Sequence, residues 1–268
     1  MKFFDSHTHS EFSPDSRMKM SDAVEQARIK GLGGIIFTDH MDIDTPTDDD
    51  TFIFDPIEQQ SAIDNIREKA GIDILKGIEI GLQPHALTKV SPYLKGATFD
   101  QIIASIHFVD KVDPYHQREY YEGKDEIQAY GRYLQNIYEC ITKYADFDIL
   151  GHYDYIVRYA PYKKKVILYE DFSEIIDQIL IFLAKEGKAL EVNSNTYRDK
   201  YGKAPYLDQA ILKRYKELGG ESVSMGSDAH DLYRIGEKFP EFSELIKSCG
   251  FKYVTHFKGR ERVFVKID

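Results

Sequence analysis

The sequence predicts an α/β fold in which parallel strands alternate with helices and close into a distorted seven-stranded (β/α)7 barrel, similar to a TIM barrel. Three observations lead to this prediction. Short apolar runs alternate along the chain with segments of helical periodicity. No glycine-rich dinucleotide-binding loop is present, which disfavours an open doubly wound sheet. Most of the apolar runs end in His, Glu or Asp, and barrel enzymes carry their chemistry at the carboxyl ends of their strands.

Length and composition limit the classes of protein to consider. The 268 residues suit one large domain with a sizeable core, so we expect a single domain over residues 1–268. The net charge of -10 disfavours generic binding to nucleic acid, which needs clustered Lys and Arg. Cys140 and Cys249 are far apart, which favours a reducing compartment and no disulfide. We see no signal peptide and no apolar run of membrane-helix length, and therefore expect a cytoplasmic protein of unspecified oligomeric state.

Seven apolar runs are expected to form the strands. Continuous runs of Ile, Leu, Val and Phe are typical of parallel strands that are buried on both faces. The strands are expected near residues 3–9, 33–40, 72–80, 102–109, 147–152, 188–195 and 222–230.

Helices are expected between these strands. Ser21 is a plausible N-cap for a first helix that Gly31 ends. Pro205 is expected to open a later helix that Gly219 and Gly220 close. The other helices are expected over 57–70, from about 126 to 144, over 171–186 and over 240–248, with polar insertions at 41–56 and 110–125 and strand-like segments at 251–256 and 261–267.

The organising motif of the chain is His7-Thr8-His9 at the end of the first strand. Side chains alternate between the two faces of a strand, so both imidazoles project from one face and can share a metal ion. On its own the pair is equally well read as two ordinary histidines. Asp228 and His230 repeat the same spacing at the end of the seventh strand.

Nine residues at or just after strand ends form a candidate metal site. Six of the nine histidines of the chain are among them, which argues against the alternative that each is an ordinary buried histidine. A set of N and O ligands without thiolate favours Zn, Mn or Fe, and nine ligands are enough for two to three divalent ions. The candidate ligands are His7, His9, Asp15, His40, Glu79, His107, His152, Asp228 and His230.

The chain resembles the polymerase and histidinol phosphatase (PHP) family over nearly its whole length. The resemblance rests on H-T-H at 7–9, T-D-H at 38–40, G-I-E at 77–79, S-I-H at 105–107, G-H at 151–152 and S-D-A-H at 227–230. It implies a distorted seven-stranded barrel with a trinuclear metal site. By this resemblance His7, His9, Glu79 and Asp228 hold the first metal, Glu79, His107 and His152 the second, and Asp15, His40 and His230 the third. Many relatives carry His where Asp15 stands.

A cluster of this kind activates water and stabilises charge on a transferring phosphoryl group. Glu79 and His107 are expected at the catalytic metal pair, and Asp228 or a nearby histidine is expected to protonate the leaving alkoxide. Arg158 and Arg198 follow the fifth and sixth strands, where guanidinium groups suit a terminal phosphate. The alternative is that both are solvated loop residues.

Within the family, the length and the long insertions resemble stand-alone histidinol-phosphate phosphatases, which implies hydrolysis of L-histidinol phosphate in histidine biosynthesis. Four acidic residues of the insertions favour a cationic substrate or are simply solvated: Asp42, Asp44, Asp110 and Asp113. One alternative is a family phosphoesterase acting on nucleotides or general phosphomonoesters. The other is a non-catalytic domain kept for structure or partner binding.

Three histidines lack strand-end placement and are not expected to be ligands: His85, His116 and His256. His116 lies in an insertion, next to Tyr115, and contact with substrate is a minority interpretation for it. Asp39 is offset by one residue from His40. It is therefore expected to face away from the metals or to support a ligand from behind.

Overall fold

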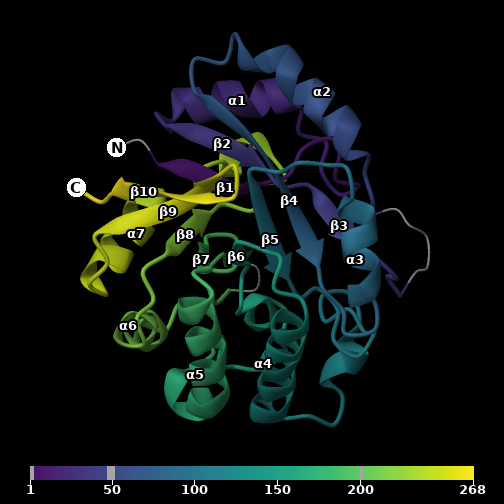
Figure 1. Ribbon diagram of the computed structural model, residues 1–268. Helices are drawn as coiled ribbons and strands as arrows, with labels where there is room; N and C mark the ends of the chain where they lie inside the picture. Colours follow the sequence, from purple (N-terminus) through teal and green to yellow (C-terminus); the bar gives the residue numbers. More distant parts are fainter. Residues whose placement is uncertain (1–2, 47–51, 200–201) are drawn as a thin grey trace.

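The computed structural model describes residues 3–46, 52–199 and 202–268, and its centre is a barrel of parallel strands (Figure 1). The order around the barrel is β1-β2-β4-β5-β6-β7-β8, and every neighbouring pair is parallel. The seven expected strands are thus confirmed, although most are shorter than expected. Their bounds are β1 (Phe4–Thr8), β2 (Gly34–Phe37), β4 (Asp73–Gly81), β5 (Gln101–Ser105), β6 (Ile149–Leu150), β7 (Ala189–Asn193) and β8 (Val223–Gly226).

An eighth strand, β3 (His40–Asp42), was not expected. It pairs in parallel with the carboxyl-terminal half of β4, beside the main order of the barrel. The sequence there reads as the start of a polar loop, residues 41–56, of which 47–51 lie outside the described residues. The strand places His40 directly opposite Glu79 in the register, so it belongs to the architecture of the site.

The barrel closes between β1 and β8 only at their carboxyl ends. The backbone N–H of Asp228 donates to the carbonyl of His7 (2.8 Å), and that of His9 donates to the carbonyl of Ala229 (2.9 Å). Thr8 and Ala229 form an isolated parallel bridge at the same place. The barrel is therefore nearly closed, and the seam brings the two His-x-His-like motifs side by side.

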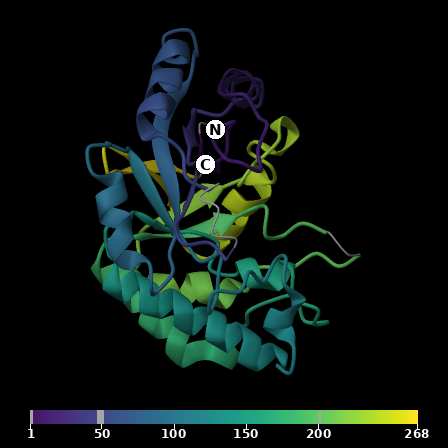
Figure 2. The ribbon, with the colours of Figure 1, turned by 90° about the vertical axis from the view of Figure 1, so that its right-hand side faces the viewer.

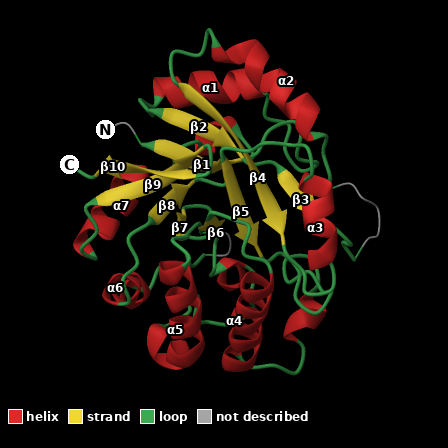
Figure 3. Ribbon diagram, viewed as in Figure 1, coloured by secondary structure: helices red, strands yellow, loops and turns green. Residues whose placement is uncertain are grey.

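Helices surround the sheet (Figure 3), and α4 and α5 lie next to each other along one side of it (Figure 2). A short helix after β4 was not expected. The helices are α1 (Met20–Ile29), α2 (Pro56–Arg67), α3 (Leu87–Leu94), α4 (Glu126–Lys143), α5 (Tyr169–Lys185), α6 (Gln209–Glu217) and α7 (Phe239–Ser248), with 3₁₀ turns η1 (Arg118–Tyr121), η2 (Tyr155–Arg158) and η3 (Leu232–Arg234).

Two expected helix starts were wrong. Helix α1 begins before Ser21, because its N-cap residue is Lys19, whose side chain makes no capping hydrogen bond. The carboxylate of Glu11 instead accepts from the N–H of Met20 (2.8 Å). Helix α6 begins after Pro205, because Asp208 caps it by accepting from the N–H of Ala210 (3.0 Å). The expected end of the first helix is confirmed, since Gly31 has φ +72°, a backbone conformation that favours glycine.

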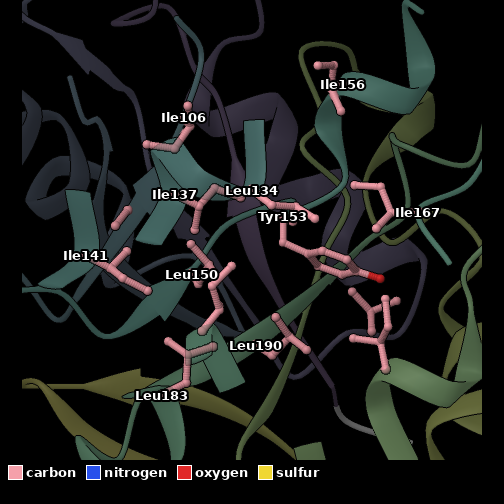
Figure 4. Close-up of a cluster of buried hydrophobic side chains, with 14 of the residues drawn as sticks. Ile106, Leu134, Ile137, Ile141, Leu150, Tyr153, Ile156, Ile167, Leu183 and Leu190 are labelled. Atoms are coloured by element: carbon pink, nitrogen blue, oxygen red, sulfur yellow. The ribbon is translucent and has the colours of Figure 1, made fainter. Parts of the chain in front are cut away.

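Part of the largest core lies between the barrel and helices α4 and α5 (Figure 4). Leu150 of β6 and Leu190 of β7 pack there in one cluster with Leu134 and Ile137 of α4 and Leu183 of α5, and each of the five is at most 1% exposed. Burial of each such side chain contributes about 1.5–3 kcal/mol. The alternate residues of these two strands face the barrel interior, where Ile149 of β6 and Ala189 of β7 lie.

A carboxyl-terminal hairpin closes the amino-terminal end of the barrel. Its strands β9 (Tyr253–Lys258) and β10 (Glu261–Lys266) are antiparallel. Phe257 joins the interior cluster, Arg260 donates to Asp148 just before β6 (2.6 Å), and the ring of His256 stacks on Phe4 at 3.8 Å. The hairpin leaves the carboxyl-terminal end of the barrel for the site. No helix among the described residues is long and apolar enough to span a membrane.

Candidate active site

The six strand-end histidines of the sequence prediction come together at the carboxyl-terminal end of the barrel. His7 and His9 share one face of β1 despite an irregularity in its pairing: Asp5 pairs with Ile35, but Thr8 pairs with Phe37. One extra residue on β1 over this interval is a bulge. The bulge allows Asp5 to bond outside the barrel, where it accepts from the N–H groups of Ser227 and Gly236, while His7 points toward Glu79.

Glu79 is the centre of the cluster. Its two carboxylate oxygens lie within 3.5 Å of nitrogen atoms of five histidines. Burial alone would raise the pKa of Glu79, but neighbouring imidazoles, above all His7 and His107, hold it well below its usual range. The five histidines are His7 (3.3 Å), His9 (3.5 Å), His40 (2.9 Å), His107 (3.3 Å) and His152 (2.8 Å).

Asp228, His230 and Asp15 extend the cluster on the side of His9. Asp228 Oδ1 is 3.3 Å from His9 Nε2, and Asp15 Oδ2 is 3.1 Å from His230 Nε2 and 3.7 Å from His40 Nε2. Asp228 has φ +49°, a conformation that is uncommon outside glycine and frequent at functional sites. Asp15 is the most exposed of the candidate ligands, since about half of its side chain is accessible.

The cluster is suited to divalent metal ions. Several of its buried atoms make no hydrogen bond with any described residue, among them His7 Nε2, His9 Nε2 and Glu79 Oε2. Buried polar atoms normally have partners, so these atoms are explained if they bind an ion. Burial, with the neighbouring His40 and His230, lowers the pKa of His9 well below its usual range, and a neutral imidazole is the form that ligates. Four groups of three residues could each hold an ion, because the ligand atoms within each group lie within 4.8 Å of one another. The groups are His7, His9 and Glu79; Glu79, His107 and His152; His9, His40 and His230; and His40, Asp42 and His107.

Acidic residues form hydrogen bonds with the Nδ1 atoms of two of the histidine rings, His7 and His107. Glu191 of β7 accepts from His7 Nδ1 (2.8 Å) through one oxygen and from the N–H of His152 (2.7 Å) through the other. Asp42 of β3 lies 2.8 Å from His107 Nδ1. Such partners fix the ring orientation of a ligand and raise its basicity. Glu191 was missed by the sequence analysis; a glutamate in the middle of a buried strand was the available signal.

The cluster forms the floor of a cavity of about 790 Å³. Arg158 of η2 lines this cavity; it is 6% exposed, its guanidinium lies 5.2 Å from the ring centre of Tyr159, and its Nε has no hydrogen bond with a described residue. Arg198 is not among the lining residues, and its guanidinium donates to Glu237 (Nε–Oε2 2.8 Å). Arg234 of η3 lines the cavity and was not singled out from the sequence.

The four acidic residues of the insertions divide into two pairs. Asp44 accepts from Lys89, and Asp110 forms an ion pair with Arg132, so both are neutralised away from the cavity. Asp42 and Asp113 line the cavity, as do Tyr115 and His116. His85 and His256 lie elsewhere. Asp39 was expected either to face away from the metals or to support a ligand. It does not line the cavity, and it accepts hydrogen bonds from Ser13 and Gln59.

Comparison with known proteins gives consistent matches. The PHP domain family matches residues 5–195. Histidinol-phosphatase from Lactococcus lactis is 32% identical over 100% of this chain and 97% of that protein. A probable histidinol-phosphatase from Clostridium acetobutylicum is 31% identical over 94% of this chain and 95% of that protein. The crystal structure of the Lactococcus lactis histidinol phosphate phosphatase complexed with Zn, L-histidinol and phosphate has a TM-score of 0.87, with 30% sequence identity over 98% of this chain and 99% of that one.

Proposed function

This chain belongs to the PHP domain family, and on that basis we propose that it is a metal-dependent phosphatase that hydrolyses L-histidinol phosphate to L-histidinol and phosphate. The observation that carries the proposal is the convergence of all nine candidate ligands at the floor of one cavity, together with Arg158. The relatives' names and the histidinol and phosphate bound in the Lactococcus lactis structure support the choice of substrate. A cytoplasmic location remains a prediction.

We assign two to three divalent ions to the cluster, with zinc favoured by the ion in the similar structure. When bound, the ions supply Lewis acidity and an activated water for attack on phosphorus. The residues that would hold them are His7, His9, Glu79 and Asp228 for the first, Glu79, His107 and His152 for the second, and Asp15, His40 and His230 for the third. Two groupings of ligand atoms in the structure match the first and second sets, and for the third set a grouping joins His40 and His230, with Asp15 3.1 Å from His230.

The chain's own residues have distinct tasks in the reaction. Arg158 is our candidate for binding the phosphate oxygens that face away from the ligand cluster, because it lines the cavity. Arg198 would have to leave Glu237 to do the same, so its role in phosphate binding stays a prediction. The leaving alkoxide needs a proton, and Asp228, His107 and His230 all line the cavity from which it can be given.

The leaving group of this substrate carries an amine and an imidazole. Asp113 lines the cavity and accepts from the N–H of Tyr115 (2.7 Å), and no Lys or Arg forms an ion pair with it among the residues described. It is the most suitable carboxylate for the cationic amine, since Asp42 is engaged by His107. Tyr155 and Tyr159 line the same cavity with ring centres 4.9 Å apart, a surface suited to a planar ring.

A panel of phosphate esters tests the proposal. Protein supplied with Zn²⁺ or Mn²⁺ is expected to release phosphate from L-histidinol phosphate with a higher kcat/KM than from a nucleoside monophosphate or an aryl phosphate. The cavity contacts of the leaving group give the reason, because they stabilise only this substrate. Similar kcat/KM for all the esters would favour a general phosphoesterase. Absence of release from every ester, with metal bound, would favour a non-catalytic domain.

A further inference from the structure

A small buried network lies behind His9, on the side away from Glu79. It consists of Ser10, Ser13, Asp39 and Gln59, of which each is at most 1% exposed and none lines the cavity. Asp39 Oδ1 accepts from the backbone N–H of Ser10 (2.6 Å) and from the hydroxyl of Ser13 (2.9 Å). Gln59 donates to Asp39 Oδ2 (2.8 Å). The carboxylate is thus held by donors on both oxygens.

The hydroxyl of Ser13 determines where the proton of His9 lies. A hydroxyl has one proton and two lone pairs, and a carboxylate that receives an N–H donor on each oxygen, as Asp39 does from Ser10 and Gln59, acts only as an acceptor. The proton of Ser13 therefore goes to Asp39. Ser13 Oγ also lies 3.1 Å from the backbone nitrogen of His40 and 3.0 Å from His9 Nδ1. Both contacts must use the lone pairs of the serine oxygen, so His9 Nδ1 carries a proton and donates it.

The other nitrogen of His9 then has the lone pair. His9 Nε2 faces Asp228 Oδ1 (3.3 Å) and Glu79 Oε2 (3.5 Å), and it makes no hydrogen bond with a described residue. We propose that Ser13 and Asp39 are positioning residues that fix His9 in the tautomer whose Nε2 lone pair is directed into the metal site. His7 and His107 are held by carboxylates directly, whereas His9 is held by a carboxylate acting through a hydroxyl.

The inference rests on the metal site of the proposed function, and metal binding rather than phosphate release is therefore the readout. Zinc affinity is measured by competition with a chelator of known affinity, and bound zinc is counted by elemental analysis. Ser13→Ala is expected to weaken zinc binding at the site of His9 about 10–100-fold, the range for loss of an outer partner, and to leave zinc at the other sites. Ser222→Ala is the matched control, because Ser222 is equally buried and its hydroxyl makes no hydrogen bond with a described residue.

Substitutions of Asp39 separate the proton argument from a simple structural role. In Asp39→Asn, donors from Ser10 and Ser13 keep an oxygen at the Oδ1 position, and Gln59 can turn its own unbonded Oε1 toward the new amide. Zinc affinity close to that of the parent protein is expected. Asp39→Ala frees the proton of Ser13 to be donated to His9 Nδ1, which favours the wrong tautomer, and a loss like that of Ser13→Ala is expected.

Nitrogen-15 NMR of the metal-free parent protein tests the tautomer without any variant. The His9 ring is expected to show a protonated Nδ1 and an unprotonated Nε2. The opposite tautomer overturns the proposal, as does unchanged zinc affinity in folded Ser13→Ala. A parent protein that binds no zinc, manganese or iron would overturn the metal site of the proposed function instead.

Discussion

Glu79 is the residue on which the cluster depends most, since its carboxylate reaches five histidines. Glu79→Gln replaces one oxygen with a donor that cannot ligate a cation. We expect turnover to fall by at least about 100-fold, because loss of a ligand should exceed the loss of an outer partner. His107→Ala is expected to behave similarly. Bound metal and phosphate release check both variants, and Glu174→Gln, at an exposed position of α5, is the control.

Near-normal turnover in either variant would remove that residue from the site. Unfolding by urea should be followed in parallel, so that loss of metal is not confused with loss of fold. Both positions lie where strands end rather than in the apolar cluster under α4 and α5, and we therefore expect both variants to fold.

Arg158 offers a second test at the level of single residues. Arg158→Ala is expected to lose about 2–4 kcal/mol in kcat/KM, the range for hydrogen bonds to charged groups. The loss should be similar for L-histidinol phosphate and for an aryl phosphate, because the phosphate is common to both. Bound metal should be unchanged, since a guanidinium does not ligate. A loss confined to L-histidinol phosphate would mean that Arg158 recognises the leaving group.

Arg198→Ala is the natural comparison for Arg158→Ala. A phosphate role for Arg198 predicts the same loss on both substrates, and the ion pair with Glu237 predicts an effect that Glu237→Gln reproduces. The two variants therefore decide whether the guanidinium leaves its partner during the reaction.

At the level of strands and helices, periodicity and composition predicted most of the fold. Buried parallel strands are continuous apolar runs, and seven such runs form the seven main strands. Strand β3 and helix α3 were missed for physical reasons. In β3, His40 and Asp42 are polar because they face the site, and only Met41 faces the core, so no apolar run marks the strand. Helix α3 is short and contains Pro92, which reads as a helix breaker.

The site was predicted as far as residue type and strand position allow. Ligands at strand ends are visible in the sequence, whereas the partner that holds each ligand depends on which strands become neighbours. Glu191 reaches His7 only because β7, β8 and β1 are adjacent in the barrel. The same packing explains Gly226, where a Cβ atom would come within 2.4 Å of both Glu191 Oε1 and His7 Cβ. No local pattern contains this information.

The carboxyl-terminal hairpin should make stability depend on pH. Burial, as the main cause, lowers the pKa of His256 to about 4. Between about pH 6.5 and 4 this histidine is protonated in the unfolded chain but neutral in the folded one. The free energy of unfolding is therefore unaffected by His256 above about pH 6.5 and decreases as the pH falls toward 4. The shift corresponds to about 3 kcal/mol. His256→Phe, which keeps a ring beside Phe4, is expected to reduce the loss of stability between pH 6.5 and 4.

Urea unfolding at a series of pH values gives the measurement. Identical pH dependence of the free energy of unfolding in the parent and in His256→Phe would show that His256 does not titrate in this range. His85→Phe is the matched control, because His85 is exposed and far from the hairpin in sequence.

For the whole molecule, the arrangement of charge is the main constraint on function. The chain has a net charge of -10, yet the proposed substrate carries a phosphate dianion. Positive charge must therefore be supplied at the cavity by Arg158 and by the bound ions, since Arg234, which also lines the cavity, is paired with Asp231 (2.8 Å). The hairpin packs at the opposite end of the barrel, so the ligands and Arg158 lie together at the other end.

Metal ions should also stabilise the whole fold. Without them the barrel retains a group of buried imidazoles and carboxylates with unsatisfied atoms, and ions that bind only the folded chain shift the unfolding equilibrium by mass action. At free zinc about 1,000 times its Kd the stabilisation is about 4 kcal/mol, which for a chain of this size corresponds to a Tm increase of about 10 °C. We expect a chelator to remove this increase, and the same chelator saturated with zinc to have no effect. Glu79→Gln should show a smaller change, because its cluster lacks the central carboxylate. An equal Tm with and without chelator, in protein shown to have released its metal, would mean that the nine residues are held in place by the barrel alone.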